Sequence, residues 1–426
     1  MDVRTPMKTV DKIRNTKVSV QAPPSKAHSL RALVISSLAA GESTIRRPLL
    51  AQDQLNLIEC LKNLGIKVSR RDDCLIVQGN AGRYSPVAEQ LNVGESGVSM
   101  NFLLSACCLC ERPVIITGAE RITQRPVDEL VKGLRQLGCR IDYLGREGFP
   151  PVRVYGGGIP GGEAVMSGKK TSQYFSSMTI AAPCADDAVT ITCVDEMTER
   201  PYLDITIEMM SLFGVQANNE NYRKITVAND VKYAPADVTI EGDYSSASFF
   251  FLAAAVCGCE VTVGGLNPET KQGDKEFLTL IRKMGCVVEQ LQDAVRVRGG
   301  PLKAIEQDMG DLPDLVPPAA IAAAFAAGTS RFTNIAHLRH KESDRPAVIA
   351  SELAKMGVDA RCQQDSLTIR GGADMHGADI DPHNDHRIAM SFAVAGLATG
   401  NQRIHNEMCV AKSFPDFWER FEVFTA

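Results

Sequence analysis

Residues 247–263 read ASFFFLAAAVCGCEVTV, an apolar, alanine-rich stretch followed by a turn residue, Gly258, and a short β-branched run. The first part predicts a helix and the last part predicts a strand. The same phrase occurs six times, at residues 32–45, 101–116, 174–192, 247–263, 319–335 and 388–404. Its turn residues lie 70–76 residues apart, so the copies fill the chain. Repetition of this kind predicts a fold of six similar units.

A second phrase follows each of the first five copies and consists of a helical stretch, a glycine and then a pair of strands. The glycines are Gly65, Gly138, Gly214, Gly285 and Gly357. Each stands where a left-handed residue is expected to stop a helix. The sixth copy ends before its strands, and residues 17–20 predict an N-terminal strand that would supply them. This closure would tie the two ends of the chain together.

Each unit is therefore expected to run helix–strand–helix–strand–strand, an α/β arrangement in which helices pack on sheets. A chain of 426 residues is long for a single core, so two domains are expected. Interruptions of the repeat place one domain, with copies one to three, at residues 22–236. The other domain would hold residues 1–21 and 237–426. We expect the ligand site in a cleft between them.

Bulk composition excludes several classes of function. The chain carries 46 Lys and Arg against 51 Asp and Glu, a net charge of −5, which argues against a general nucleic-acid or acidic-membrane binder. The N-terminus lacks the apolar core of a signal peptide, and no uncharged apolar run reaches about 18 residues. Thirteen cysteines without secretory signs predict reduced thiols in a cytoplasm. Cys107 and Cys110 form a CxxC in an apolar helix, and we expect core packing rather than metal binding there.

Cations gather at the starts of the predicted helices. They are Lys26, Lys170 and Arg387 before the first helices, and Arg125, Arg200, Arg345 and Lys412 near the second helices. A helix N-terminus already carries partial positive charge, so cations there are locally unfavourable. Free backbone N–H groups and cations would act together if anions bind. The pattern therefore predicts a site for more than one phosphate or carboxylate group.

Two carboxylates, Asp314 and Glu342, lie among these cations, and Glu199 is a third candidate. A carboxylate held among cations stays ionised and is available as a general base. The sequence therefore predicts proton transfer at an anion-binding site.

Several motifs in a fixed order resemble the enolpyruvyl transferase family over essentially the whole chain. They are residues 24–26 (PSK) with Arg31, 124–126 (QRP), 171–173 (TSQ), 241–247 (EGDYSSA), 313–317 (PDLVP), 341–345 (KESDR), 384–387 (NDHR) and 412–416 (KSFPD). The resemblance implies two inside-out α/β domains (inverse barrels) of three repeats each, with the active site in the interdomain cleft. It also implies transfer of the enolpyruvyl group of phosphoenolpyruvate to the 5-hydroxyl of shikimate 3-phosphate by addition and elimination. That step releases phosphate and leads toward chorismate and the aromatic amino acids.

The resemblance also implies roles for individual residues. Asp314 and Glu342 would shuttle protons, with Lys26 as an acid. Phosphoenolpyruvate would be bound by Lys26, Gly97, Arg125, Gln173, Arg345, His386, Arg387 and Lys412. Shikimate 3-phosphate would be bound by Lys26, Arg31, Thr171, Ser172, Gln173, Arg200, Tyr202, Asp314 and Lys341. No metal, organic cofactor, nucleic acid or membrane is implied, and the protein is expected to be a cytoplasmic monomer.

Three positions depart from the pattern of the family. Ala27 stands where many members have a serine, Asn101 where an arginine usually ends the glycine-rich motif, and Glu199 where many members have a serine that contacts the acceptor phosphate. A carboxylate at that place would repel the phosphate unless a neighbouring cation neutralises it. These departures leave open an enolpyruvyl transferase that acts on a different anionic acceptor.

Two further alternatives are disfavoured. The branch of the family that uses UDP-N-acetylglucosamine typically carries a cysteine in the loop equivalent to residues 118–124, and this loop has none. A silent relative that only binds anions would not need proton-transfer groups such as Asp314, Glu342 and Lys26.

Overall fold

The computed structural model describes residues 7–426, and contacts between residues divide them into two compact units. One unit is Pro24–Ile240. The other is Glu241–Ala426 together with the described residues up to Pro23. The boundaries expected from the sequence lie after residues 21 and 236. Each unit is described by itself below.

The unit Pro24–Ile240 contains three consecutive copies of the repeat. The first copy has α1 (Lys26–Leu38), β3 (Glu42–Arg46), α2 (Gln52–Asn63), β4 (Lys67–Arg71) and β5 (Cys74–Gln78). The second has β6 (Gln90–Asn92), α3 (Gly97–Ala106), β7 (Val114–Thr117), α4 (Glu120–Thr123), α5 (Asp128–Gln136), β8 (Ile141–Tyr143) and β9 (Val152–Val154). The third has β10 (Gly162–Met166), α6 (Gln173–Ala181), β11 (Val189–Cys193), α7 (Arg200–Leu212), β12 (Asn218–Glu220) and β13 (Lys224–Val227). Last, β14 (Asp237–Thr239) returns to the first sheet.

The second unit repeats the same succession of elements. The fourth copy has α8 (Tyr244–Cys257), β15 (Glu260–Gly264), α9 (Phe277–Met284), β16 (Val287–Gln290) and β17 (Ala294–Arg298). The fifth has β18 (Glu306–Asp308), α10 (Val316–Phe325), β19 (Gly328–Thr333), α11 (Arg345–Lys355), β20 (Asp359–Cys362) and β21 (Ser366–Gly371). The sixth has β22 (Asp379–Ile380), α12 (His386–Thr399), β23 (Gln402–His405) and α13 (Phe417–Phe421). Short 3₁₀ turns connect several of these elements.

Six small sheets, one for each copy, are formed by the described strands, which confirms the six-unit prediction. Five sheets have four strands and the sixth has three. In the second copy the order is β6-β7-β9-β8, where the first pair is parallel and the others are antiparallel. A parallel pair needs a crossover, and α3 provides it between β6 and β7. The expected unit therefore gains one strand ahead of its first helix.

The N-terminal strands complete two different sheets. β2 (Lys17–Gln21) runs parallel to β15, with Val18 opposite Val261, so it completes the fourth copy. β1 (Met7–Val10) is antiparallel to β23, with Met7 opposite His405, and completes the sixth copy. The prediction that residues 17–20 supply the sixth copy is therefore wrong. The reason is that each unit's first copy lacks a preceding strand of its own, so β14 fills that place for α1 and β2 fills it for α8.

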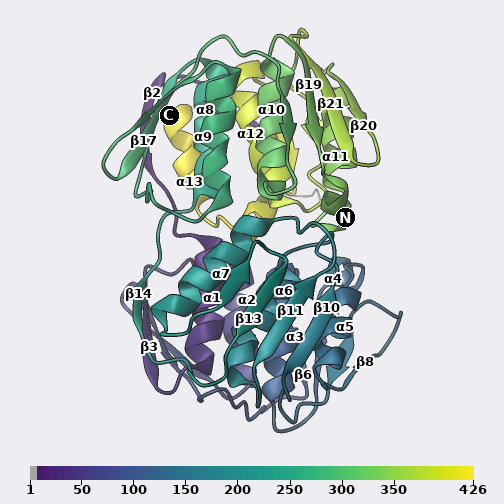
Figure 1. The fold of residues 1–426 in the computed structure, drawn as a ribbon. Coiled ribbons are helices and arrows are strands. Elements are labelled where there is room, and N and C mark those ends of the chain that lie inside the picture. Colours follow the sequence, from purple (N-terminus) through teal and green to yellow (C-terminus); the bar gives the residue numbers. More distant parts are fainter. Residues whose placement is uncertain (1–6) are drawn as a thin grey trace, which may run out of the picture. The chain divides into compact units, whose positions relative to one another are not determined.

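The first helix of each copy is buried along most of its length. In α8 the buried run extends from Tyr244 to Ala255, and in α10 it extends from Val316 to Ala324. α8, α10 and α12 contact one another and stand side by side in Figure 1. A helix that is apolar on all sides is stable only when protein surrounds it, and these three helices belong to the core of this unit. α1, α3 and α6 have the same burial in the other unit.

The five predicted helix-stopping glycines all have positive φ, between 83° and 118°, which confirms the prediction. Cys107 and Cys110 are buried and unbridged, as expected for core packing. The Cys110 thiol and burial together hold the pKa of Cys107 well above its ordinary value. No metal-binding group of His, Cys, Asp or Glu is found among residues 7–426. The described helices include none with the length and apolar character needed to span a membrane.

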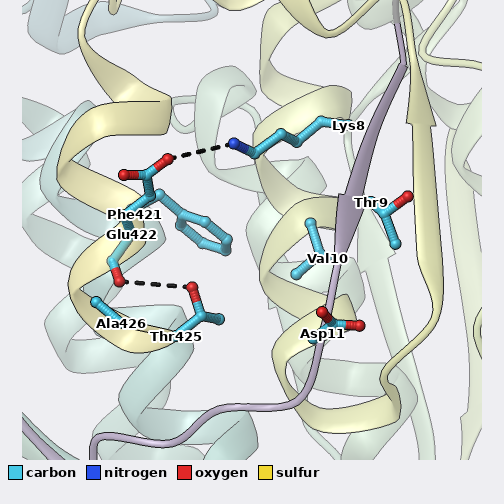
Figure 2. Close-up of a pocket in the computed structure, with 8 residues that line it drawn as sticks. All are labelled: Lys8, Thr9, Val10, Asp11, Phe421, Glu422, Thr425 and Ala426. Atoms are coloured by element: carbon cyan, nitrogen blue, oxygen red, sulfur yellow. Dashed lines mark hydrogen bonds and ion pairs between the residues drawn. The ribbon is translucent and has the colours of Figure 1, made fainter.

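One surface pocket lies between β1 and the C-terminal residues (Figure 2). It is lined by Lys8, Thr9, Val10, Asp11, Phe421, Glu422, Thr425 and Ala426. Lys8 Nζ lies 3.3 Å from Glu422 Oε1, and both side chains are exposed. None of these eight described residues is a candidate site residue, so the pocket is separate from the residues that the sequence singles out.

Candidate functional site

In the unit that contains residues 241–426, three carboxylates converge on the guanidinium of Arg345, the first residue of α11. Arg345 Nε lies 2.8 Å from Asp385 Oδ2, Nη1 lies 2.7 Å from Asp314 Oδ1, and Nη2 lies 2.9 Å from Glu342 Oε2. The Arg345 side chain is only 1% exposed. The structure therefore brings two predicted proton-transfer residues onto one buried cation.

A second set of cations contacts the same carboxylates. Arg387 Nη2 lies 2.7 Å from Asp314 Oδ2, and Lys412 Nζ lies 3.5 Å from Glu342 Oε1. Each of the two carboxylates is thus bridged between Arg345 and another cation. Lys341 is buried nearby and its charge also acts on Asp314. Cations outnumber carboxylates in this cluster, as expected for a site that receives anions.

The electrostatics keep Asp314 ionised. Burial opposes ionisation of its carboxyl, but the charges of Arg387, Arg345 and Lys341 outweigh burial and hold its pKa well below the ordinary value. An ionised carboxylate can accept a proton at neutral pH. Asp314 therefore has the protonation state that a general base requires.

Helix starts position most of these side chains. Asp314 lies in a 3₁₀ turn directly before α10, and Glu342 lies three residues before α11 begins. Asp385 caps α12, because its Oδ1 accepts the backbone N–H of Arg387 at 3.0 Å. His386 is buried, with Nδ1 at 4.0 Å from Asp385 Oδ1. The network thus gathers residues from three consecutive helix starts.

In the unit Pro24–Ile240, Lys26 pairs with an aspartate that the sequence analysis did not single out. Lys26 opens α1 after the capping residue Ser25, and its Nζ lies 2.7 Å from Asp53 Oδ2. Asp53 lies in the first turn of α2 and its side chain is 3% exposed. A buried ion pair between two helix starts holds the Lys26 ammonium group in one place.

Hydroxyl and amide groups at the start of α6 form a second cluster. Thr171 donates its hydroxyl proton to the carboxylate of Glu199, and Ser172 Oγ donates to the backbone carbonyl of Glu199 at 2.7 Å. The backbone N–H of Gln173 donates to Thr171 Oγ1 at 3.3 Å. Asn101 Nδ2 donates to Gln173 Oε1 at 3.0 Å. Two of the departures from the family's pattern, Glu199 and Asn101, thus contact predicted binding residues directly.

Arg31 is buried and joins α1 to α7. Its Nε donates to Thr206 Oγ1 at 2.7 Å, Nη1 donates to Ala27 O at 3.0 Å, and Nη2 donates to Tyr202 O at 2.8 Å. The guanidinium also lies 5.3 Å from the centre of the Phe102 ring. These hydrogen-bond partners are neutral, and burial lowers the pKa of Arg31 to about 10. Arg31 is therefore a buried cation whose neighbours here do not neutralise it.

Arg125 lies against the start of α3. A Cβ built on Gly97 would be 2.4 Å from Arg125 Cζ, so any larger residue here would require the guanidinium to move. Gly97 follows the capping residue Ser96, whose Oγ accepts the backbone N–H of Ser99. The Arg125 guanidinium therefore lies directly against Gly97. The sequence assigns both residues to the binding of phosphoenolpyruvate, so two predicted site residues are neighbours here.

Two other cations of this unit have partners within it. Lys170 Nζ lies 2.5 Å from Asp128 Oδ2, and both side chains are partly exposed. The Arg200 guanidinium lies 5.6 Å from the centre of the Tyr222 ring. Lys170, a cation that the sequence pattern assigned to anion binding, is thus paired with a carboxylate of α5.

Sequence reasoning missed the carboxylates that pair with the site cations. Asp53 is 27 residues from Lys26, and Asp385 is 40 residues from Arg345. Asp385 shows only the signal of a helix cap. Because each partner comes from another helix, no local spacing could have identified these pairs.

Comparison with known proteins gives a consistent result. The family model described as EPSP synthase (3-phosphoshikimate 1-carboxyvinyltransferase) matches residues 10–421. The chain is similar to a 3-phosphoshikimate 1-carboxyvinyltransferase of Methanoculleus marisnigri, at 43% identity over 93% of this chain and 94% of the relative. A relative of the same name from Syntrophobacter fumaroxidans is 40% identical over 97% of this chain and 99% of its own. Among solved structures, an EPSP synthase from Acinetobacter baumannii matches with a TM-score of 0.81 at 27% identity, covering 98% of each chain.

Proposed function

This chain belongs to the EPSP synthase (3-phosphoshikimate 1-carboxyvinyltransferase) family, and we propose how its residues share the work of that reaction. The reaction moves the enolpyruvyl group of phosphoenolpyruvate to the 5-hydroxyl of shikimate 3-phosphate and releases phosphate. The acceptor hydroxyl attacks C2 while C3 gains a proton, and the tetrahedral intermediate then loses phosphate from C2 and a proton from C3, which restores the double bond. A base for the hydroxyl, an acid for C3 and cations for the substrate charges are therefore required.

The observation that carries the proposal is the pairing of Asp314 and Glu342 on the Arg345 guanidinium, with Arg387 and Lys412 beside them. Asp314 is held ionised, the only state in which a carboxylate can accept the hydroxyl proton of shikimate 3-phosphate. Glu342 would share the proton transfers of the addition and elimination steps with Asp314 and Lys26. The three cations would bind the carboxylate and phosphate of phosphoenolpyruvate, whose charge they match.

The unit Pro24–Ile240 supplies the remaining groups of the proposal. Lys26 would be the acid that protonates C3. Arg125, Gly97 and Gln173 would help to bind phosphoenolpyruvate. Shikimate 3-phosphate would be bound by Arg31, Thr171, Ser172, Arg200 and Tyr202, together with Gln173, Lys26, Asp314 and Lys341. The buried Arg31, whose hydrogen-bond partners named above are neutral, supports a role for an anion here. His386, next to Arg387, would also help to bind phosphoenolpyruvate.

A direct assay tests the function. Phosphate release should be measured with phosphoenolpyruvate alone and with shikimate 3-phosphate added. We expect turnover only when both substrates are present, with a median enzyme's kcat of about 10 per second. A rate that does not change when shikimate 3-phosphate is added would move the proposal to a different anionic acceptor.

The pair formed by Lys26 and Asp53 predicts a positioning effect. Asp53→Asn removes the charge that holds the ammonium group, so the acid becomes less well placed, and we expect kcat to fall by about 10- to 100-fold. The phosphate-release assay measures this at saturating concentrations of both substrates. Asp72→Asn, in the same copy at an exposed turn, is the matched control and should leave kcat unchanged. An Asp53→Asn variant with the kcat of the unaltered chain would contradict the role of this pair.

The finer architecture is part of the same proposal. Each unit would be an inside-out α/β domain, with the first helices of its copies inside and its three sheets outside. The full burial of α8, α10 and α12 supports this arrangement, as does the similarity to solved EPSP synthases. The two domains would correspond to residues 22–236 and to 1–21 with 237–426. We also propose a monomeric cytoplasmic protein, which sedimentation and cell fractionation would test.

A further inference from the structure

Glu199 occupies an unusual place directly before α7. It is fully buried, at 0% exposure, and its backbone has a φ of 59°, in the left-handed region. A side chain other than glycine in that region costs about 1 kcal/mol or more, and such residues persist where the surroundings require them. The start of α7 lies beside the start of α6, whose Thr171 and Ser172 both bond to Glu199.

The two N-cap side chains at this point do not cap their own helices. Ser172 is the N-cap residue of α6 and Glu199 is the N-cap residue of α7, yet neither side chain accepts a backbone N–H of its helix. Ser172 instead donates to the Glu199 carbonyl, and Thr171 donates to the Glu199 carboxylate. One residue therefore receives the hydroxyl protons of both neighbours.

The number of available protons decides what Thr171 can offer to a ligand. A threonine hydroxyl has one proton, and an ionised carboxylate can only accept. While Thr171 donates to Glu199, its remaining capacity is for accepting, and the Gln173 N–H already uses part of it. A phosphate oxygen is also an acceptor. Thr171 can donate to a phosphate only when it gives up its bond to Glu199.

We propose that Glu199 is a specificity-determining residue, whose carboxylate competes with the acceptor's phosphate group for the hydroxyl proton of Thr171. The proposal rests on the proposed function, which assigns Thr171 and Ser172 to shikimate 3-phosphate. This chain would therefore bind the phosphate group of shikimate 3-phosphate more weakly than a variant that lacks the Glu199 carboxylate. Ser172 is unaffected by a side-chain substitution at this position, because its partner is the backbone carbonyl of Glu199. The bond donated by Ser172 should therefore persist in variants of Glu199.

Two substitutions reduce the competition to different degrees, since the amide of glutamine is a weaker acceptor than the carboxylate and glycine has no side chain. Glu199→Gln keeps the volume of the side chain and removes its charge, and its amide can donate to Thr171 Oγ1. Glu199→Gly removes the side chain and fits a φ of 59° without strain. Glu196→Gln is the matched control, because Glu196 is an exposed carboxylate on the same loop. Circular dichroism should show that all three variants are folded before binding is measured.

Titration calorimetry with shikimate 3-phosphate and with shikimate tests the proposal on the full chain. We expect the Kd for shikimate 3-phosphate to fall by about tenfold in both Glu199 variants, the size expected of one hydrogen bond to a charged group. The Kd for shikimate, which lacks the phosphate, should change by less than about twofold, because no competing acceptor is involved. Glu196→Gln should leave both constants unchanged.

A second substitution checks that Thr171 carries the effect. Thr171→Val should weaken binding of shikimate 3-phosphate more in the Glu199→Gln background than in the unaltered chain, because the hydroxyl proton is available only there. Equal effects in the two backgrounds would overturn the proposal. It would also be overturned if both Glu199 variants bound shikimate 3-phosphate more weakly, or if shikimate gained as much affinity as the phosphate ester.

Different results would contradict the proposed acceptor and the proposed role of Glu199. If the unaltered chain neither binds shikimate 3-phosphate nor turns it over with phosphoenolpyruvate, the proposed acceptor is wrong. If it does both and the Glu199 variants show no gain for the phosphate ester, only the competition by Glu199 is wrong.

Discussion

Replacing Asp314 with asparagine is expected to lower kcat by about a thousandfold, within the range that a general acid or base contributes. The amide has nearly the same shape as the carboxylate but cannot take up the hydroxyl proton of the acceptor. It also loses its charge interactions with Arg345 and Arg387, at 2.7 Å each. Phosphate release at saturating concentrations of both substrates measures the effect, and circular dichroism reports whether the variant is folded.

A surface ion pair provides the control for this experiment. Asp379 in β22 also pairs with an arginine, Arg403, but both side chains are about half exposed. Asp379→Asn removes a half-exposed, paired carboxylate that is not a candidate site residue, so kcat should stay within about twofold. An Asp314→Asn variant that keeps more than about a tenth of the turnover would show that another group is the base.

The six repeated units could be predicted from the sequence because the repeat makes one signal visible six times. A single apolar stretch such as residues 247–263 could be a helix of many folds, whereas six copies at even spacing imply six equivalent units. Each copy also marks its helix ends with a capping residue or a glycine. The sheets, and the positive φ of Gly65 and its four equivalents, followed these signals.

Strand partners were harder to predict, because pairing is decided in space. Residues 17–20 have the alternation of a strand, but that pattern does not say which sheet they join. The chain enters one unit after Pro23 and leaves it after Ile240, so the two copies that begin a unit each lack a leading strand. β2 and β14 fill these places, and β1 was left to pair with the sixth copy.

The site shows the same limit. Arg345 and Arg387 could be singled out because cations recur at helix starts, against the preference of the helix dipole. Their carboxylate partners carry no such signal. Asp385 looks like an ordinary cap, and its bond to Arg345 depends on how α11 and α12 start beside each other. Glu199 stood out as a departure from a family pattern, while its bonds to Thr171 and Ser172 needed coordinates.

Replacing Arg345 with methionine is expected to lower the free energy of unfolding by about 3–5 kcal/mol, the usual cost of removing one partner of a buried ion pair. Arg345 is the shared partner of Asp314, Glu342 and Asp385, so its loss leaves three neighbouring carboxylates with less positive charge. Urea unfolding followed by tryptophan fluorescence suits this test, because the single tryptophan, Trp418, belongs to the same unit as Arg345. Arg403→Met, which breaks the exposed pair with Asp379, should have a much smaller effect.

The loss of stability caused by Arg345→Met should depend on pH. The folded-state pKa of Asp314 is depressed, so its contribution to stability is present above the unfolded-state pKa of about 3.9 and is lost as pH falls toward the folded-state value. Arg345→Met removes part of that contribution. The stability difference between the unaltered chain and the variant should therefore be largest near pH 7 and shrink as pH falls below about 4. A difference that stays constant down to pH 3 would mean that lost packing of the arginine side chain, and not its charge, accounts for the effect.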